Sequence, residues 1–328
     1  MSQSFLDLKK SRKTLTDKLN EELNKTNSGG YQKYAAGEKF WTLSVDKVGN
    51  GRALIRFLNA PPGEEVPFVK YWDHGFEGPG GWYIENSLMT LGLPDPCAEF
   101  NTKLWASGKA GQDLVSGTRG KAGSKRRIHF ISNILVIDDP AHPENNGKIF
   151  LFNYGKQIYD VLNSAMHPKF DTQKSFNPFD FWDGATLDLQ STVEVTNKGS
   201  QRTYKTSVFQ PCSPVVDSED GIEKVWRGCS SLKEFLDPKH FKSYDELKSK
   251  VERVWSGKLS ELTAEDELVA PQATKPRVQK ATPPKVQNKV SPPWEEVPDD
   301  DGVDVPQAAE TTAPKGKGIE YFRNLVND

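Results

Sequence analysis

The segment at residues 119–130, RGKAGSKRRIHF, concentrates positive charge beside an aromatic residue. Five cations stand within nine residues, and Phe130 follows the last of them after two intervening residues; the cations are Arg119, Lys121, Lys125, Arg126 and Arg127. Guanidinium and ammonium groups bind phosphate, and aromatic rings stack on unpaired bases. A loop with this charge density cannot pack into a core, and its glycines keep it adaptable. The segment therefore predicts the rim of a groove that accepts single-stranded nucleic acid.

Five more residues could contribute to such a groove. Arg56 lies within RALIRFL (52–58), a strand pattern in which a cation is costly unless it lines a hydrated groove. Tyr83, Phe152, Tyr154 and Tyr204 lie in strand contexts and could present ring faces to bases. Each ring alone is weak evidence, because an aromatic residue in a strand most often packs in the core.

Residue sets suited to catalysis are sparse in this sequence. Asp73-His74 and Asp138-Asp139 are the candidates, and Asp138-Asp139-Pro140 is more simply a turn that ends a strand. The sequence shows no Ser/His/Asp set, phosphate-binding glycine loop or paired-carboxylate motif. We therefore predict a binding protein without a cofactor rather than an enzyme, and a nuclease that uses Asp138 and Asp139 is the enzymatic alternative.

The elements that must position these residues are mainly strands. Strand patterns occur at 39–45, 52–58, 66–72, 81–85, 128–137, 148–155, 185–197 and 203–210. Gly49-Asn50-Gly51 between two such runs predicts a hairpin. Short strands with turn residues between them and no βαβ rhythm favour an antiparallel barrel, a mainly β (α+β) fold. Helices are expected at 154–165 and 243–255, the second with a capping box from Ser243 to Glu246.

Charge and composition divide the chain into four parts. Residues 1–34 hold seven Lys/Arg and four Asp/Glu, a net charge of +3, and Leu15, Leu19 and Leu23 are spaced as in an amphipathic helix. Residues 35–258 hold most of the apolar residues and form the expected core. Residues 259–293 are rich in Pro and Lys, as in an extended linker. Residues 294–328 hold nine acids and three bases, a net charge of -6. Such asymmetry is typical of a nucleic-acid binder with an acidic tail, although simple solubility patterning would explain it equally well.

Two absences narrow the cellular setting that we expect. No long apolar run predicts a membrane span, and the polar N-terminus lacks the apolar centre of a signal peptide. Cys97, Cys212 and Cys229 are an odd number without framework spacing, which fits free thiols in a reducing cytosol.

Five strings in the core resemble the single-stranded DNA-binding (helix-destabilising) proteins of T-even-type bacteriophages. They are GNGRALIRFL (49–58), HGFEGPGGWYIE (74–85), NILVIDDPAHPENNGKIF (133–150), WDGA (182–185) and KSYDELKSKVERV (242–254). The resemblance implies an OB-fold core with a cationic cleft for single-stranded DNA, a flexible basic N-terminal arm for cooperative self-association, and a disordered acidic tail. The tail would bind phage DNA polymerase, helicase-loading and recombination proteins in the cytoplasm of the infected bacterium, in DNA replication, recombination and repair.

The resemblance also assigns residues. It places Arg56, the cluster Lys125 to Arg127, Phe130, Phe152 and Tyr204 at cleft positions of the family. The arm motif would be KKSRKT (9–14), with Lys9, Lys10, Arg12 and Lys13 as its cations. Better-known members hold zinc with one His and three Cys, of which only His74 and Cys97 remain here, with Ser87 and Phe100 at the other two positions. Because a structural zinc site needs four ligands, we predict no zinc.

Two other functions stay open at this point. An RNA-binding translational regulator would use the same stacking and phosphate contacts, because only contacts to the 2′-hydroxyl distinguish RNA from DNA. A protein-interaction hub that works through its charged ends would leave the basic aromatic segment unexplained.

Overall fold

The computed structural model describes residues 5–24, 39–118, 121–170, 172–196 and 199–256 of the 328-residue chain. It does not describe the side chains of residues 6, 7, 13 and 20–24. The linker 259–293 and the acidic tail 294–328 lie outside the described residues, as do positions 1–4 and 25–34 of the expected arm.

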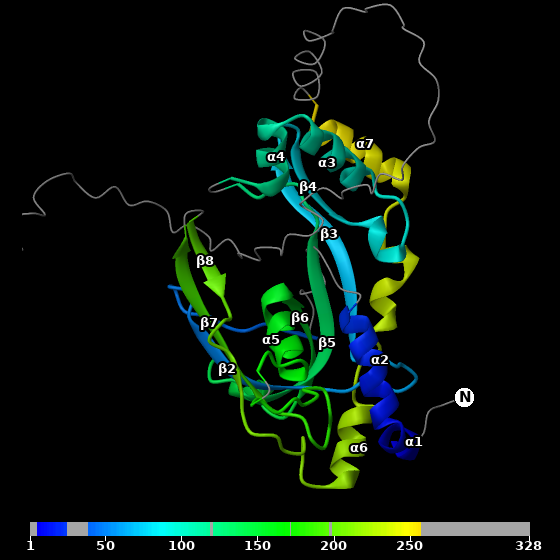
Figure 1. Ribbon diagram of the computed structural model, residues 1–328, viewed down its shortest axis with the longest axis vertical. Coiled ribbons are helices and arrows are strands. Elements are labelled where there is room, and N and C mark those ends of the chain that lie inside the picture. The colour runs from blue at the N-terminus through cyan, green and yellow to red at the C-terminus, as the bar shows by residue number, and fades with distance from the viewer. Residues whose placement is uncertain (1–4, 25–38, 119–120, 171, 197–198, 257–328) are drawn as a thin grey trace, which may run out of the picture.

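The described part is a mixed α+β fold built on one large sheet (Figure 1). The strands are β1 (Phe40–Trp41), β2 (Gly51–Phe57), β3 (Phe68–Gly78), β4 (Gly81–Asn86), β5 (Arg127–Asp138), β6 (Ile149–Gly155), β7 (Leu187–Thr196), β8 (Gly199–Thr203) and β9 (Val208–Phe209). The helices are α1 (Phe5–Lys10), α2 (Arg12–Asn24), α3 (Pro96–Ala106), α4 (Lys109–Ser116), α5 (Lys156–Met166), α6 (Glu219–Arg227) and α7 (Tyr244–Val254). Short 3-10 turns occur at η2 (Leu88–Leu91), η3 (Pro143–Asn145), η4 (Lys233–Leu236) and η5 (Pro238–His240).

The sheet corrects two expectations about topology. Its main path runs β1-β6-β5-β2-β7-β8, and among the described strands no pairing joins the two ends, so the predicted closed barrel is wrong. The hairpin predicted around Gly49-Asn50-Gly51 is also wrong, because β1 pairs in parallel with β6 instead of with β2. The Asp46 carboxylate accepts hydrogen bonds from the backbone N–H groups of Val48, Gly49 and Asn50. These side-chain contacts, rather than strand pairing, stabilise the loop before β2.

Both helices expected in the core form close to their predicted bounds. α5 starts two residues later than predicted, and α7 carries the predicted capping box between Ser243 and Glu246. Helices α3, α4 and α6 were not predicted from the sequence.

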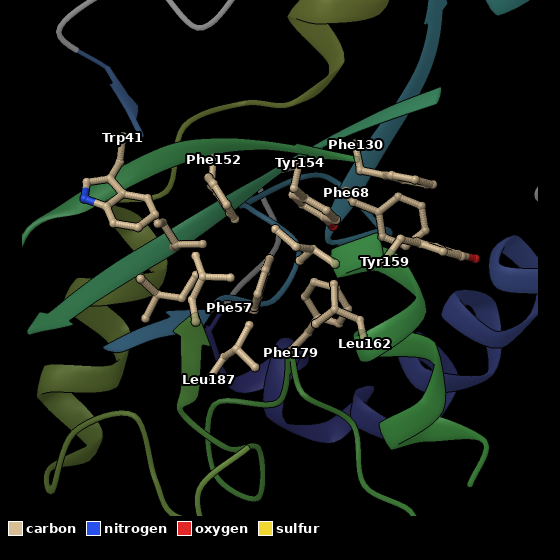
Figure 2. Close-up of a cluster of buried hydrophobic side chains, with 14 of the residues drawn as sticks. Trp41, Phe57, Phe68, Phe130, Phe152, Tyr154, Tyr159, Leu162, Phe179 and Leu187 are labelled. Atoms are coloured by element: carbon tan, nitrogen blue, oxygen red, sulfur yellow. The ribbon is translucent and has the colours of Figure 1, made fainter. Parts of the chain in front are cut away.

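Two hydrophobic clusters lie along the long strand β3. The first packs under α5 and includes Phe68 near the start of β3 (Figure 2). The second packs β3 and β4 against α3 and α7 and includes Phe76 near the end of β3. Figure 1 shows β3 rising from the body of the sheet to the layer of α3, α4 and α7. The middle of β3 therefore spans the junction between two cores.

The N-terminal segment packs against its own core. Phe5, Leu8 and Leu15 are buried in a cluster with Phe181 and Trp226, and Leu19 is buried in the first cluster. The sequence predicted a flexible arm here, whereas residues 5–24 form two helices that bury an apolar stripe. The predicted amphipathic spacing explains this burial, because a helix with such a stripe is stabilised by covering it.

Candidate nucleic-acid interface

The basic segment between α4 and β5 is anchored at its base. The backbone N–H groups of Ser124 and Lys125 donate to the carbonyls of Leu114 and Val115 in α4, at 3.1 and 3.0 Å. Gly123 lets the segment approach this helix, because a Cβ there would lie 2.1 Å from the Val115 carbonyl oxygen. Lys121 is exposed at the tip, and Arg119 lies outside the described residues. In Figure 1 the blue-green segment projects to the side of the molecule where β7 and β8 lie. A rigid base therefore presents an exposed cationic tip.

Strand alternation sends two neighbouring arginines of this segment to opposite faces of the sheet. Arg127 pairs with Asp73 across β5 and β3, and its Nη2 donates to the Asp73 carboxylate at 3.0 Å. The guanidinium lies over Gly75, where a Cβ would stand 1.8 Å from Nη2. Asp73 is fully buried, so Arg127 neutralises a buried carboxylate on this face. This structural role differs from the predicted phosphate contact.

Arg126 lies on the other face, beside Trp72. Its guanidinium carbon lies 5.9 Å from the centroid of the Trp72 ring, and its Nη1 donates a hydrogen bond to the Met89 sulfur at 2.6 Å. Lys70 Nζ lies 5.0 Å from the same ring. Lys70, Trp72 and Arg126 are all partly exposed. We call these three residues the junction face, because they lie between the two hydrophobic clusters.

Three of the predicted stacking rings are buried instead. Phe130 is fully buried and stacks on Tyr159 of α5, with ring centroids 4.3 Å apart (Figure 2). Phe152 packs edge-on against Trp41 in the same cluster. Tyr83 is fully buried in the second cluster, where burial raises the pKa of its hydroxyl. Tyr154 is a fourth ring buried in the first cluster. All four rings are enclosed by other core side chains, so none offers an open face to a base.

Arg56 is also buried, on the face of β2 opposite the first cluster. Its Nη2 donates to the backbone carbonyls of Asp180 and Ser213 at 2.9 and 2.8 Å, and its side chain is 1% exposed. Burial lowers the pKa of this guanidinium to about 10, so it stays charged at neutral pH. Arg56 is therefore held by carbonyls beneath the 180–184 loop, away from the junction face.

Tyr204 is the predicted ring that keeps partial exposure. It follows β8, and its backbone N–H donates to the side chain of Gln157 near the start of α5 at 3.0 Å. Burial of the ring raises the pKa of its hydroxyl. α5 also packs on Phe130, and Phe130 pairs with Lys70 across β5 and β3. One helix therefore contacts both Tyr204 and the cross-strand partner of a junction-face residue.

The cations of the expected arm contact the core of their own chain. Lys9 Nζ lies 2.7 Å from the Glu219 carboxylate. Arg12 donates through Nε and Nη2 to both oxygens of Asp180 at 2.9 and 2.8 Å, and its guanidinium lies 4.8 Å from the Trp182 ring centroid. Lys10 is exposed, and the side chain of Lys13 lies outside the described residues. The core therefore carries a formed recognition site for Arg12.

The residues at the family's zinc position do not fit a metal site. Of the four aligned positions only His74 and Cys97 carry metal-ligand atoms, since Phe100 has none and the Ser87 hydroxyl donates to Asp95 at 2.8 Å. Asp95 stands nearby, but its two oxygens also accept from three backbone N–H groups, those of Leu88, Cys97 and Ala98. His74 Nδ1 lies 2.9 Å from the Ser124 carbonyl oxygen. Hydrogen bonds and apolar packing hold this region together.

The candidate catalytic aspartates form a structural turn. Asp139 is buried, accepts a hydrogen bond from the Trp41 indole N–H at 2.8 Å and also accepts from Asn145. Asp138 is exposed at the end of β5. This arrangement matches the predicted strand-ending turn.

Comparison with known proteins identifies a class of DNA-binding proteins. The profile of the family described as gp32 DNA binding protein like matches residues 49–255. The chain is 34% identical over 236 residues to the single-stranded DNA-binding protein of Enterobacteria phage T2, which covers 70% of this chain and 73% of that protein. It is 33% identical over 249 residues to the single-stranded DNA-binding protein of Enterobacteria phage T4, covering 73% of this chain and 77% of that protein.

These matches settle the family. The chain belongs to the gp32-like DNA-binding proteins of T-even-type phages, as the sequence predicted. Among the residues that the structure describes, no helix has the length and apolar character needed to cross a membrane.

The sequence analysis missed Trp72. The sequence contained two signals for it. Lys70 and Trp72 lie two residues apart in the strand pattern 66–72, so they share a face, and the cationic segment directly precedes the strand pattern 128–137. Only the pairing of β3 with β5 places Arg126 on the same face.

We predict that Arg127→Ala lowers the free energy of unfolding by about 3 kcal/mol, because the buried Asp73 carboxylate loses its guanidinium. Urea denaturation measures the change. Lys121→Ala is the control and should stay within about 0.5 kcal/mol of wild type, because Lys121 is exposed. Adding Asp73→Asn to the Arg127→Ala variant should restore part of the loss. Equal stability of Arg127→Ala and Lys121→Ala would contradict the structural role of Arg127.

Proposed function

We propose that this protein binds single-stranded DNA with little sequence preference, in the cytoplasm of an infected bacterium. The observation that carries the proposal is the cationic segment 121–126, anchored on α4 beside the partly exposed Trp72 ring. The two relatives that match 70% and 73% of the chain are single-stranded DNA-binding proteins. An OB-fold core, with its groove on the side of the junction face, is part of this proposal.

The proposed mechanism is non-enzymatic. Cations neutralise phosphates, and each single-strand phosphate neutralised contributes about -0.7 to the slope of log affinity against log salt. Because the protein binds unpaired strands in preference to duplex, it shifts duplex melting by mass action. Such binding would serve replication, recombination and repair by keeping exposed strands accessible.

RNA binding is the second candidate, since phosphates and base faces are common to both nucleic acids. The names of the phage relatives favour DNA. A matched pair of DNA and RNA oligonucleotides separates the two.

The proposed preference for single strands can be measured as an affinity. Titration of the intrinsic fluorescence of the eight tryptophans with oligo(dT), a matched oligo(U) and duplex DNA at two salt concentrations should show tight, salt-sensitive binding to oligo(dT) and weak binding to duplex. Equal affinity for duplex would reduce the basic segment to a general electrostatic patch. Stronger binding of oligo(U) would favour the RNA candidate.

We also propose that the N-terminal segment mediates self-association along the strand. The contacts of Arg12 support this proposal, since Asp180, Asp183 and Trp182 form a surface that recognises an arginine. The Asp180 carboxylate also accepts from the backbone N–H groups of Trp182 and Asp183, which fixes its orientation. The same surface on a neighbouring protomer offers identical contacts to Lys9 and Arg12, and Lys10 and Lys13 would add charge.

We predict that Arg12→Glu lowers affinity for poly(dT) about tenfold, because each contact between protomers loses its charge pair. Affinity for an oligonucleotide that holds one protomer should stay unchanged. Adding Asp183→Arg should restore part of the cooperative binding, because Asp183 lies 2.6 Å from Arg12 and is well exposed. An equal loss on both lattices would show that the segment belongs only to the fold of its own chain.

The acidic tail is proposed to act as a DNA mimic. Its acids, among them Glu295, Glu296, Asp299, Asp300, Asp301 and Asp304, would cover the cationic face when DNA is absent. Displaced by DNA, the tail would become available to the phage polymerase, the helicase loader and recombination proteins.

Truncation after residue 293 tests this mimicry. The truncated protein should bind oligo(dT) several-fold more tightly than the full chain at low salt, and the difference should vanish at high salt because screening weakens the tail's attraction. Affinities that match at low salt would argue against autoinhibition and leave the tail as a partner-binding or solubilising segment.

A further inference from the structure

Trp72 has three properties that no other ring considered for the site combines. Its ring is partly exposed, whereas Phe130, Phe152 and Tyr83 are buried. It lies on β3 between the two hydrophobic clusters. Two cations lie over the ring, Lys70 from β3 itself and Arg126 from the position just before β5.

The register of β3 shows which face the ring occupies. Trp72 pairs with Ile128 of β5, and alternate residues of β3 share its face: Phe68 and Lys70 before it, His74 and Phe76 after it. Trp82 of β4 pairs with Glu77, so it projects from the opposite face of the same strand pair. Trp82 is 57% exposed. It therefore serves as the control, an exposed tryptophan on the face opposite Lys70 and Arg126.

The indole edge of Trp72 adds a second observation. Its Nε1–H is buried and has no hydrogen-bond partner among the described residues. Buried donors in proteins are nearly always paired, so an unpaired one calls for an explanation. A carbonyl oxygen of a nucleobase that reaches this edge would supply the acceptor that the protein does not.

We propose that Trp72 is a base-stacking platform, with Arg126 and Lys70 holding the phosphates on either side of the stacked base. The proposal rests on the proposed function and assigns its stacking position. A ring between two cations suits a nucleotide, because the ring accepts the base while the cations neutralise its flanking phosphates. The ligand is an unpaired base of a single strand, since a base inside a duplex has no free face.

Four variants test the assignment in the full-length protein, with oligo(dT) as the probe. Trp72→Ala should weaken binding about 5- to 150-fold, the range expected for loss of one stacked base. Trp72→Phe should recover most of that loss, because a ring remains. The slope of log affinity against log salt should not change in either variant. Arg126→Ala should lower the magnitude of that slope by about 0.7. Trp82→Ala should bind like wild type.

A second readout covers the case in which Trp72→Ala does not fold. Trp72→Phe should lose part of the fluorescence quenching that oligo(dT) causes, while Trp82→Phe should retain it. If wild type binds oligo(dT) but Trp72→Phe keeps the full quenching, or folded Trp72→Ala binds like wild type, the platform assignment is wrong and the proposed function stands. If wild type itself does not bind oligo(dT), the proposed function fails.

Discussion

The pairing of β3 with β5 is the constraint on which the rest of the site depends. Six residue pairs, from Phe68 opposite Ser132 to Asp73 opposite Arg127, fix which side chains share a face. A shift of one residue would exchange the two faces, because side chains alternate along a strand. The observed register brings Arg126 beside Trp72 and sends Arg127 to the buried Asp73. One hydrogen-bonded ladder thus separates the arginine beside Trp72 from the arginine that neutralises the buried Asp73.

Burial explains why most predicted rings are not available to bases. The run IHFISNILVI carries apolar residues at both odd and even positions, a pattern typical of a strand that is covered on both faces. Phe130 accordingly packs on Tyr159 of α5, and Phe152 packs against Trp41 in the same cluster (Figure 2). Trp72 escapes this burial because it lies where the first cluster ends and the second begins. The gap between two cores, rather than the strand pattern alone, exposes the ring.

Much of the site's outline could be predicted from the sequence, and the remainder depends on tertiary contacts. The family, the basic segment, the capping box of α7 and the Asp138-Asp139 turn all follow from local residue patterns. The role of Arg127 does not, because it depends on Asp73 across the sheet and on the space above Gly75. The failed hairpin at Gly49 has a similar cause, since β1 finds its partner in β6, more than a hundred residues away. Arg56 illustrates the same limit, because the carbonyls that hold it come from residues 180 and 213.

Photocrosslinking locates the bound strand on the protein and therefore tests whether Trp72 contacts it. An oligo(dT) in which single thymines are replaced by 5-iodouracil would be crosslinked to the full-length protein, and the modified peptides would be mapped by mass spectrometry. If Trp72 is a stacking platform, crosslinks should form at Trp72 and at residues 121–126, and none at Trp82 on the opposite face. Crosslinks concentrated on Trp82, with none at Trp72, would contradict that assignment.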